Sequence, residues 1–582
     1  MAMVAETYEA PQATDKPSKR FSRLAEIRAL RERPPELARA RLRYLALQPL
    51  FALPLYGWTL SARTPTALMI APSDPWPGDA ATGQAILQGN FICAGQRVAH
   101  PAPLWHPLGV DRPWCLALHG FDWLRDLRAL GGDAARRGAR DLVASWLAAY
   151  QRWDALAWEP AVIGKRLTAW LGHYDFFASS AEIEFRHRLL GSMVQQARHL
   201  GRVLPAGLAG LDLLENIQGL LLAGLALPGQ ESLLQRGLEL LRGELAKQLL
   251  GDGGHVERAP ARQLALLRNL VVLRSAYHAA ELPVPADLQN AIEQAAPMLR
   301  LLRHGDGGLA LFNGGRASEG WLVDMVLQHA GGAGPTLKAA PMSGFQRLQA
   351  GRCLVLVDAG DLPAPGYDAQ AHAGTLSFEM SVGRERLIVN CGAQQGDGAW
   401  RDVQRTTAAH STLCLADRNS SELQAGGASG RRQARVTCRR EEAEGMSLLE
   451  MSHDGYEPLF GLTHRRRIYI SANGEDLRGE DCLLGSADAA KHGEFAIRFH
   501  LHPDVTVSLT QSGESALLRL PKGGGWRFRA SGASLAVEPS VYLGDEGPIR
   551  RTQQVVLKGR GHGDETVVKW ALQREAKART KR

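Results

Sequence analysis

Hydrophobic residues in the first half of the chain recur at helical spacing. In segment 210–229 the apolar residues lie three or four positions apart, and a Pro-Gly pair ends the run. These residues are Leu214, Ile217, Leu221 and Leu225. The same spacing recurs in 120–130, 141–153, 163–177, 185–200 and 262–282. Because short breaks with Gly, Pro or Asp separate these segments, the pattern predicts a long array of helices packed in pairs, without the strict period of an ankyrin or tetratricopeptide solenoid.

The pattern changes near residue 340. Beyond Pro341, apolar and polar positions alternate, and β-branched and aromatic residues become frequent. The alternating segments are 352–360, 375–392, 465–471, 494–510 and 566–573. The turns between them are rich in Gly, Asp and Asn. Many short strands at close spacing predict an antiparallel sandwich or barrel.

The sequence therefore predicts a multidomain α + β protein in which a helical half precedes an all-β half. A chain of 582 residues is too long for one ordinary core, which agrees with two or more domains. The predicted helical domain covers 21–335 and the β-sandwich 340–573. Residues 1–20 are predicted to be a disordered N-terminus and 574–582 a basic tail.

Composition places the chain among ordinary globular proteins, with 45% hydrophobic and 22% charged residues. No stretch reaches the roughly 18 apolar residues of a spanning helix, so no transmembrane segment is predicted. The N-terminal sequence shows no apolar region typical of a secretory signal. The seven cysteines include no CxxC pair, which excludes a Cys-rich zinc module and gives no support to a disulfide framework.

The net charge of +8, from 68 basic and 60 acidic residues, allows an anionic partner. The basic residues are spread along the chain and no recognisable nucleic-acid module accompanies them, so we expect no nucleic-acid partner. A solvated surface and a polyanionic ligand are both compatible with this charge.

Four stretches of the β half resemble the C-terminal domain of the heparinase II/III family: AHAGTLSFEMSVGRERLIVNCGA (371–393), TTAAHSTLCL (406–415), HDGY (453–456) and THRRRIYIS (463–471). The helical half resembles that family in HGFDWLRDL (119–127), ENIQGLLLAGL (215–225) and DGGHVERAP (252–260). The similarity covers roughly 95–575 and is greatest to a branch of heparinase-like proteins in alphaproteobacteria. It implies an incomplete α/α-toroid followed by an antiparallel β-sandwich, with the working cleft between them. It also implies β-elimination on a uronate-containing acidic polysaccharide, such as a glycosaminoglycan.

Such an elimination removes the C5 proton of a uronate and expels the O4 oxygen. A base must reach C5, an acid must reach O4, and the carboxylate must be neutralised by an amide, Arg, protonated His or metal. From the family pattern, His372 and His410 are candidate catalytic residues. Arg405, just before TTAAH, and Tyr456 are candidate substrate-binding residues; a surface salt bridge is an equal alternative for Arg405.

The resemblance also implies a divalent metal, zinc, held by His372, Asn390 and His410. Relatives often carry Asp at the position of Asn390, and Asn brings no charge to offset the cation. No cofactor is otherwise implied.

The helical half departs from the family pattern at two places. Active relatives carry an Asn-His pair where this chain has Leu211 and Asp212, leaving Asn216 one helical turn away as a candidate substrate-binding amide. They also carry Tyr-His after the DGG segment, where this chain has Arg262 and Gln263. Arg is a poor general base, but it can grip a carboxylate in a bidentate manner.

Two interpretations remain open. In the first, other residues carry the chemistry, with His255 and Glu257 of the DGGHVE loop as the favoured catalytic candidates and His119, Tyr174 and Tyr277 as further ones. In the second, the chain is a catalytically silent glycan-binding or cell-envelope protein that retains the fold. The family suggests the envelope or periplasm, while the absence of a visible signal segment leaves the cytoplasm as the alternative. The oligomeric state is not predictable.

Overall fold

The computed structural model of the chain describes residues 34–394, 400–424, 429–485, 493–545, 547–561 and 564–575. The chain forms two compact units. The helical unit comprises the described residues up to Gln248 together with Arg268–Ile292, and the sandwich unit comprises Leu249–Leu267 together with the described residues from Glu293 onwards. The predicted disordered segment 1–20 and most of the predicted tail 574–582 lie outside the described residues.

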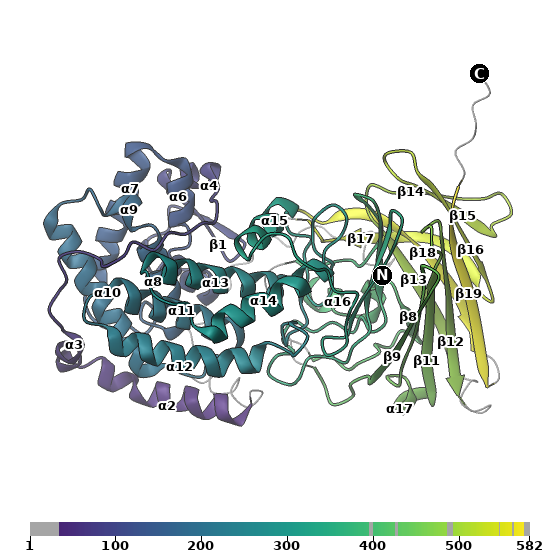
Figure 1. Cartoon of the computed structure of the whole chain (residues 1–582), viewed down its shortest axis with the longest axis horizontal. Coiled ribbons are helices and arrows are strands. Elements are labelled where there is room, and N and C mark those ends of the chain that lie inside the picture. Colours follow the sequence, from purple (N-terminus) through teal and green to yellow (C-terminus); the bar gives the residue numbers. More distant parts are fainter. Residues whose placement is uncertain are drawn as a thin grey trace, which may run out of the picture. The chain divides into compact units, whose positions relative to one another are not determined.

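Helices dominate the helical unit (Figure 1). They are α2 Pro35–Phe51, α3 Pro54–Leu60, α4 Ala80–Leu87, α5 Arg112–Gly120, α6 Leu124–Leu130, α7 Gly132–Ala149, α8 Pro160–Gly172, α9 Tyr174–Phe177, α10 Ile183–Val203, α11 Gly210–Ala226 and α12 Glu231–Gln248. Helices α13 Pro260–Ala279 and α14 Ala286–Leu301 each contribute residues to both units, and a hairpin of β1 Asn90–Cys93 and β2 Gln96–Ala99 joins the helical unit.

Helix α11 forms the centre of the helical unit, because 15 of its 17 residues are buried. It packs against α8 and α12. A Cβ atom on Gly219 would lie 2.2 Å from the Gly164 carbonyl oxygen, so α8 and α11 approach closely at these two glycines. The sequence prediction of one helix over 120–130 is wrong in detail: Phe121 adopts a left-handed conformation, with φ of 64°, and ends α5 before α6 begins.

The sandwich unit contains two antiparallel sheets. The nine-stranded sheet has the order β17-β18-β13-β7-β6-β5-β4-β3, with β8 paired to β13, and the eight-stranded sheet has the order β14-β15-β16-β19-β12-β11-β10-β9. The strands of the first sheet are β3 Ala339–Ala340, β4 Phe345–Ala350, β5 Cys353–Asp358, β6 Phe378–Val382, β7 Glu385–Val389, β8 Leu413–Leu415, β13 Glu494–Leu501, β17 Ser534–Tyr542 and β18 Arg550–Arg560. Those of the second are β9 Val436–Ala443, β10 Met446–His453, β11 Leu462–Ile470, β12 Asp476–Gly485, β14 Thr506–Leu509, β15 Ser515–Arg519, β16 Gly525–Ser531 and β19 Glu565–Arg574. The remaining helices of this unit are α15 Gly320–His329, α16 Trp400–Gln404, the 3-10 helix η3 Thr407–Ala409 and α17 Glu457–Phe460.

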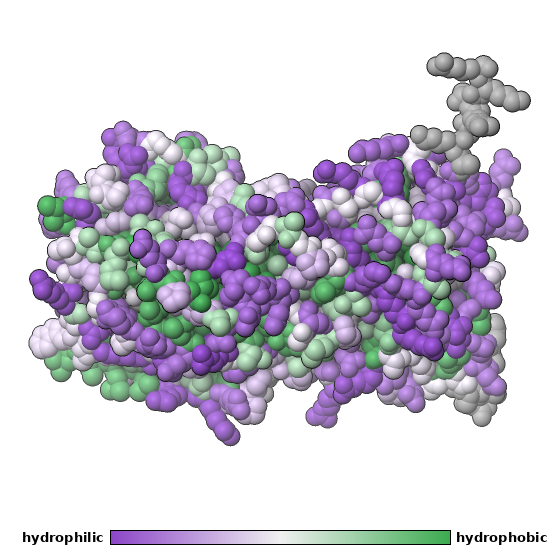
Figure 2. Space-filling view, in the orientation of Figure 1, coloured by the Kyte–Doolittle hydropathy of each residue, from purple (hydrophilic) through white to green (hydrophobic). Residues whose placement is uncertain are grey.

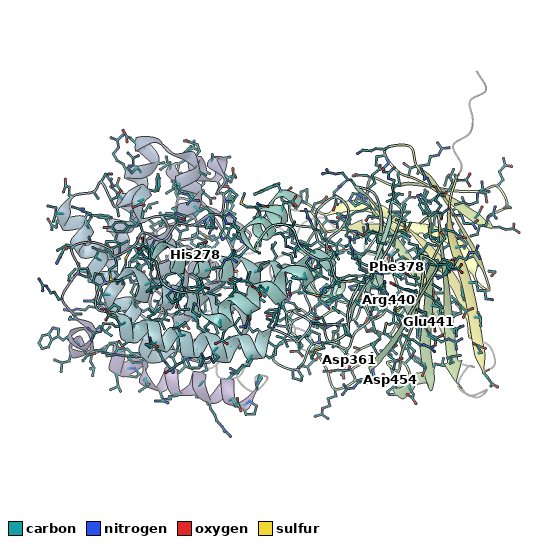
Figure 3. The ribbon with its side chains drawn as sticks, viewed as in Figure 1. His278, Asp361, Phe378, Arg440, Glu441 and Asp454 are labelled. Carbon is teal, nitrogen blue, oxygen red and sulfur yellow. The ribbon has the colours of Figure 1, made fainter. Side chains whose placement is uncertain are left out.

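The core of the sandwich lies between its two sheets. Phe378, labelled among the strands in Figure 3, stacks on Trp570 with ring centroids 5.5 Å apart. Trp570 packs directly on Gly479, where a Cβ atom would lie 2.0 Å from the indole ring. Only glycine therefore fits at this position of β12, and the close approach joins β12 and β19.

The outer positions of the eight-stranded sheet are polar. Along β11, buried and half-buried residues alternate without exception, as a strand with one face in the core requires. Figure 2 shows a mainly hydrophilic surface over the visible part of these strands. Among the described residues, no helix is long and apolar enough to cross a membrane.

The buried histidines of the sandwich unit predict a pH-dependent stability. Burial lowers the pKa of every described histidine that is buried in this unit below the ordinary value: His255, His304, His372, His410, His453, His464 and His500. The unfolded chain binds a proton at each near pH 6.5 and the folded chain does not, so stability is fully present above pH 6.5 and falls as the pH drops. Each histidine contributes a loss of up to about 1.4 kcal/mol per pH unit.

We therefore expect the denaturant midpoint to fall steadily from pH 7.5 to pH 5.0. Carboxylates titrate mostly below this pH range, so the change of the midpoint reports chiefly on the histidines. A midpoint that stays constant or rises towards pH 5.0 would show that these imidazoles are protonated in the folded state.

Candidate functional site

Two histidines meet between the loops that precede β6 and β8. His372 lies in the loop before β6, and His410 directly follows η3. The His372 Nδ1 and His410 Nε2 atoms are 3.1 Å apart, and the two rings are nearly perpendicular. A Cβ atom on Gly374 would lie 2.5 Å from the His410 ring, so this position must be glycine for the ring to sit there. The structure thus brings together the two histidines that the sequence predicted as catalytic.

The hydrogen bonds of the pair determine its protonation pattern. His410 Nδ1 lies 2.8 Å from the Thr406 carbonyl oxygen, which can only accept, so a neutral His410 carries its proton on Nδ1. Its Nε2 atom is then an acceptor, and His372 Nδ1 must donate to it. The neutral His372 ring is therefore left with a lone pair on Nε2, and no described residue hydrogen-bonds to that atom. A lone pair held in this way can accept a proton.

The environment keeps both rings neutral. Burial, reinforced by the His410 ring and the guanidinium of Arg405, holds the pKa of His372 well below its usual value. Burial also lowers the pKa of His410, to about 4, although the Thr406 carbonyl favours the charged form. At neutral pH the pair is consequently a base and not a cation.

Arg405 supports the loop that carries His372. Its guanidinium donates to the carbonyl oxygens of Ala371 and Gln424, at 2.9 Å and 3.0 Å, and its own carbonyl accepts from the Ala373 N–H. Its exposed fraction is only 2%. Arg405 therefore positions the backbone on both sides of His372, which is a different role from the predicted contact with substrate.

Asn313 joins the histidine pair to the DGGHVE loop, and the sequence interpretation missed it. Its Oδ1 atom accepts from the His372 N–H at 3.1 Å, and its Nδ2 atom donates to the Arg258 carbonyl at 2.9 Å. Asn313 adopts a left-handed conformation, with φ of 46°. The Asn-Gly-Gly sequence that begins here is a turn signal that could have indicated this geometry.

The DGGHVE loop presents an ion pair next to this junction. Arg262 Nε lies 3.2 Å from Glu257 Oε2, and the Arg262 side chain is 36% exposed. His255 Nδ1 accepts from the Glu257 N–H at 3.2 Å. Burial, followed by the charge of Arg262, lowers the pKa of His255 to about 3, so this histidine is neutral. Gln263, at the position where relatives carry His, accepts from the His255 N–H and is buried.

A buried arginine anchors the same loop to the β-strands. Arg258 donates to the Ser343 carbonyl at 2.6 Å and forms an ion pair with Asp358, and its guanidinium lies over the Phe345 ring. The loop carrying Glu257 and the histidine pair thus belong to one hydrogen-bonded framework within the sandwich unit.

The predicted zinc site does not fit these residues. The Asn390 side chain is used on both sides: Nδ2 donates to Glu379 Oε1 at 3.2 Å, and Oδ1 accepts from the Ser411 N–H at 2.9 Å. The lone pair of His410 Nε2 faces the His372 ring. The described residues contain no group of three or more His, Cys, Asp or Glu side chains arranged to hold a metal.

The other predicted substrate-binding residues are buried. Both amide atoms of Asn216 are engaged: Oδ1 accepts from the Gly164 N–H and joins α11 to α8, and Nδ2 donates to the Asp212 carbonyl within α11. The Tyr456 hydroxyl donates to the Leu413 carbonyl at 2.9 Å, and its ring lies in the sandwich core. Neither side chain presents a polar atom to solvent.

The further candidates of the helical unit are buried as well. His119 accepts from Trp146 Nε1 at 2.9 Å and lies 3.0 Å from the Trp105 carbonyl, and burial lowers its pKa to about 3. Tyr174 and Tyr277 are 7% and 3% exposed. Leu211, at the position of the relatives' Asn, is also buried.

A charged network in the core lies beneath the histidine pair. Arg466, which the strand period places opposite Arg465 and Arg467, is fully buried and donates to the Ser411 and Leu376 carbonyls at 2.9 Å each. It also forms a bidentate pair with Asp481. Arg466 is therefore part of the core, while its neighbours Arg465 and Arg467 lie on the opposite face of β11.

Comparisons with known proteins agree with this architecture. The sequence model "Heparinase II/III N-terminus" matches residues 144–329, and "Heparinase II/III-like, C-terminal" matches residues 332–571. The chain is 33% identical over 519 residues to "FtsZ-localized protein C" of Caulobacter vibrioides, covering 85% of this chain and 88% of that protein.

Solved structures show the same fold at low sequence identity. The crystal structure of heparinase III matches with a TM-score of 0.67 at 15% identity, covering 96% of this chain and 92% of that chain. The heparan sulfate lyase HepC from Pedobacter heparinus matches with a TM-score of 0.60 at 17% identity, covering 96% and 92%. The predicted fold class, an N-terminal helical toroid-type domain followed by an antiparallel β-sandwich, is thereby confirmed.

Proposed function

Because the chain belongs to the heparinase II/III family, we propose that it binds a uronate-containing acidic polysaccharide and cleaves it by β-elimination. The observation that carries the proposal is the neutral His372–His410 pair, whose hydrogen bonds leave a lone pair on His372 Nε2. A neutral imidazole has the free lone pair that a general base needs to take a proton from carbon. Family membership supports the class of reaction, and the geometry supports the choice of residue.

In the proposed step, His372 Nε2 takes the C5 proton of the uronate. The electron pair of the C5–H bond forms the C4=C5 double bond, the C4–O4 bond breaks, and the imidazolium returns its proton to O4. His410 holds the reacting ring in its tautomer through the Nδ1–Nε2 hydrogen bond. Arg262 leaves its ion pair with Glu257 and binds the substrate carboxylate instead, which neutralises the charge of that carboxylate.

A second candidate is a catalytically silent glycan-binding protein of the cell envelope. The position of the relatives' carboxylate-neutralising Asn holds the buried Leu211, and the nearby Asn216 is engaged in helix packing. The relative FtsZ-localized protein C is named for its localisation and not for an activity on a glycan, which is compatible with this second candidate.

Incubation of the full chain with heparan sulfate, chondroitin sulfate, alginate and polyglucuronate tests the two candidates. We expect new ultraviolet absorbance from the unsaturated uronate with at least one of these polymers. Binding by calorimetry without new absorbance would favour the silent candidate, and neither binding nor absorbance would overturn both. Boiled protein and the His372→Gln variant are the controls.

We further propose that the protein works at the cell envelope or in the periplasm, in keeping with its family. Fractionation of cells that produce the tagged chain tests this location. Recovery only with the soluble cytoplasmic fraction would contradict it.

A further inference from the structure

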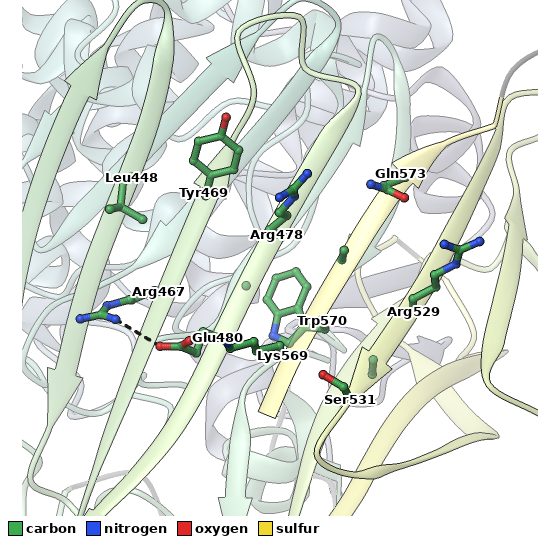
Figure 4. Close-up of a pocket in the computed structure, with 13 residues that line it drawn as sticks. Leu448, Arg467, Tyr469, Arg478, Glu480, Arg529, Ser531, Lys569, Trp570 and Gln573 are labelled. Atoms are coloured by element: carbon green, nitrogen blue, oxygen red, sulfur yellow. Dashed lines mark hydrogen bonds and ion pairs between the residues drawn. The ribbon is translucent and has the colours of Figure 1, made fainter. Parts of the chain in front are cut away.

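A groove of about 560 Å³ lies on the outer face of the eight-stranded sheet, which we call the Ala571 groove (Figure 4). Strands β10, β11, β12, β16 and β19 contribute to it. Its charged lining consists of four cations, Arg467, Arg478, Arg529 and Lys569, and one carboxylate, Glu480. The surplus of positive charge favours an anionic ligand.

The strand register arranges these side chains around a shallow floor. Ala571 of β19 pairs with Arg478 of β12 on one side and with Arg529 of β16 on the other. Lys569 and Gln573 lie two residues before and after Ala571, so they project from the same face of β19. Arg478 and Arg529 therefore belong to strands about 10 Å apart, with a single methyl group between them.

The groups around this floor are available for a ligand. The Arg529 and Gln573 side chains make no hydrogen bond or ion pair with the described residues. Lys569 lies 3.8 Å from Glu480, which is a loose pairing. Arg478 is paired with Asp476 at 2.6 Å, but its side chain remains 60% exposed. Arg467, at the rim, differs because Glu450 and Glu480 both hold it.

Two largely apolar side chains, Tyr469 and Leu448, extend the same series of cross-strand neighbours. Tyr469 of β11 pairs with Arg478, and Leu448 of β10 pairs with Tyr469. The Tyr469 ring is half-buried, and its hydroxyl lies near the Met446 sulfur. A flat ring beside a cationic cradle suits a ligand that alternates sugar rings with carboxylates better than an acidic peptide, whose charges are carried on flexible side chains.

We propose that the Ala571 groove is a second binding site for the acidic polysaccharide, separate from the histidine pair. A sugar carboxylate sits over Ala571 between Arg478 and Arg529, with Lys569 and Gln573 as further donors, and the neighbouring sugar ring lies on Tyr469. The groove lies on the solvent side of the sheet whose core side carries Arg466. The choice of a glycan rests on the proposed function, whereas the anion site rests on the sheet geometry alone.

Calorimetric titration of the full chain with polyglucuronate oligosaccharides tests the proposal, in a His372→Gln background that prevents cleavage. The double variant Arg478→Ser/Arg529→Ser should bind at least about tenfold more weakly than its parent, because two charge-assisted contacts are lost. The matched control is Arg439→Ser/Arg560→Ser, which removes the same charge from two exposed ion pairs outside the groove. Its affinity should stay within about twofold of the parent.

The outcomes separate this proposal from the proposed function. Unchanged affinity in the groove variant, equal losses in both double variants, or no binding of polyglucuronate by the parent would overturn the groove site. Poly-glutamate that binds as tightly and competes would identify an acidic peptide as the occupant and overturn the glycan. Groove-dependent binding without any new ultraviolet absorbance from the wild-type chain would reject the lyase and leave the groove site standing.

Discussion

Replacing His372 with alanine is expected to lower the rate of the proposed elimination by about 10²- to 10⁴-fold, the usual contribution of a positioned general base. The His372 ring is the member of the pair whose lone pair is unused, since His410 Nδ1 is committed to the Thr406 carbonyl. The reaction is measured as the initial rate of absorbance increase from the unsaturated product. The binding constant for the polymer should change much less than the rate, because the ring acts on the proton and not on the carboxylate.

The pH profile distinguishes a base from a purely structural histidine. Because the pKa of His372 is held well below its usual value, its basic form persists as the pH falls through 6.5. The wild-type rate should therefore show no acid limb near pH 6.5, only one at markedly lower pH. His372→Gln keeps a side-chain donor for His410 but offers no base, so it should fold and remain inactive.

His502→Ala is the matched control. This partly buried histidine lies next to Asp504 and does not belong to the His372–His410 pair. Its rate should equal that of the wild type. A His372→Ala protein that retains most of the rate, with an unchanged melting temperature, would exclude His372 as the base.

The sequence predicted the fold well because hydrophobic periodicity is a local signal. The apolar spacing of 210–229 corresponds to α11, and the alternation in 566–573 corresponds to β19. The prediction of one helix over 120–130 was wrong because helix-compatible spacing continues through Phe121, whose left-handed backbone is set by tertiary packing. Periodicity cannot detect a break that leaves the apolar spacing intact.

The site was less predictable because its contacts join distant residues. Family resemblance pointed to His372 and His410, but the contact between them, and hence the tautomer, depends on loops 38 residues apart. The link through Asn313 spans 55 residues to Arg258. Arg466 shows the same limit: its burial depends on the ion pair with Asp481 of the next strand, a contact that the sequence does not reveal.

The contacts around the histidine pair also show where this chain agrees with its family and where it departs from it. The framework around the histidine pair is complete, with Arg405, Asn313 and Arg258 holding three separate loops. The departures from the family pattern lie in or near helices, at Leu211 and Arg262. In the proposed reaction the base is His372 and the residues expected to neutralise the carboxylate differ from the family pattern, which predicts a changed substrate more directly than a lost reaction. Several acidic polymers must therefore be tested.

Replacing Asp481 with asparagine is expected to destabilise the sandwich unit by about 3–5 kcal/mol, because it leaves the buried Arg466 charge without its partner. Asp481 accepts four hydrogen bonds: two from Arg466, one from His464 Nε2 at 2.7 Å and one from Trp570 Nε1 at 2.9 Å. An asparagine offers one acceptor oxygen and turns an amide N–H towards these donors. The effect is measured as a shift of the denaturant midpoint followed by Trp fluorescence.

The loss of stability should extend along a series of hydrogen bonds that ends at Asp481, because every acceptor nitrogen in this series is already used. The Gly455 N–H donates to His453 Nδ1, His453 Nε2 then donates to His464 Nδ1, and His464 Nε2 donates to Asp481. Glu494→Gln is the matched acid-to-amide control, because its pair with Arg560 is exposed and should contribute little. An Asp481→Asn midpoint equal to that of Glu494→Gln would show that Arg466 finds sufficient compensation in the Ser411 and Leu376 carbonyls alone. A large difference would instead establish the Asp481 carboxylate as the counterion that keeps Arg466, and through it the backbone next to His410, in place.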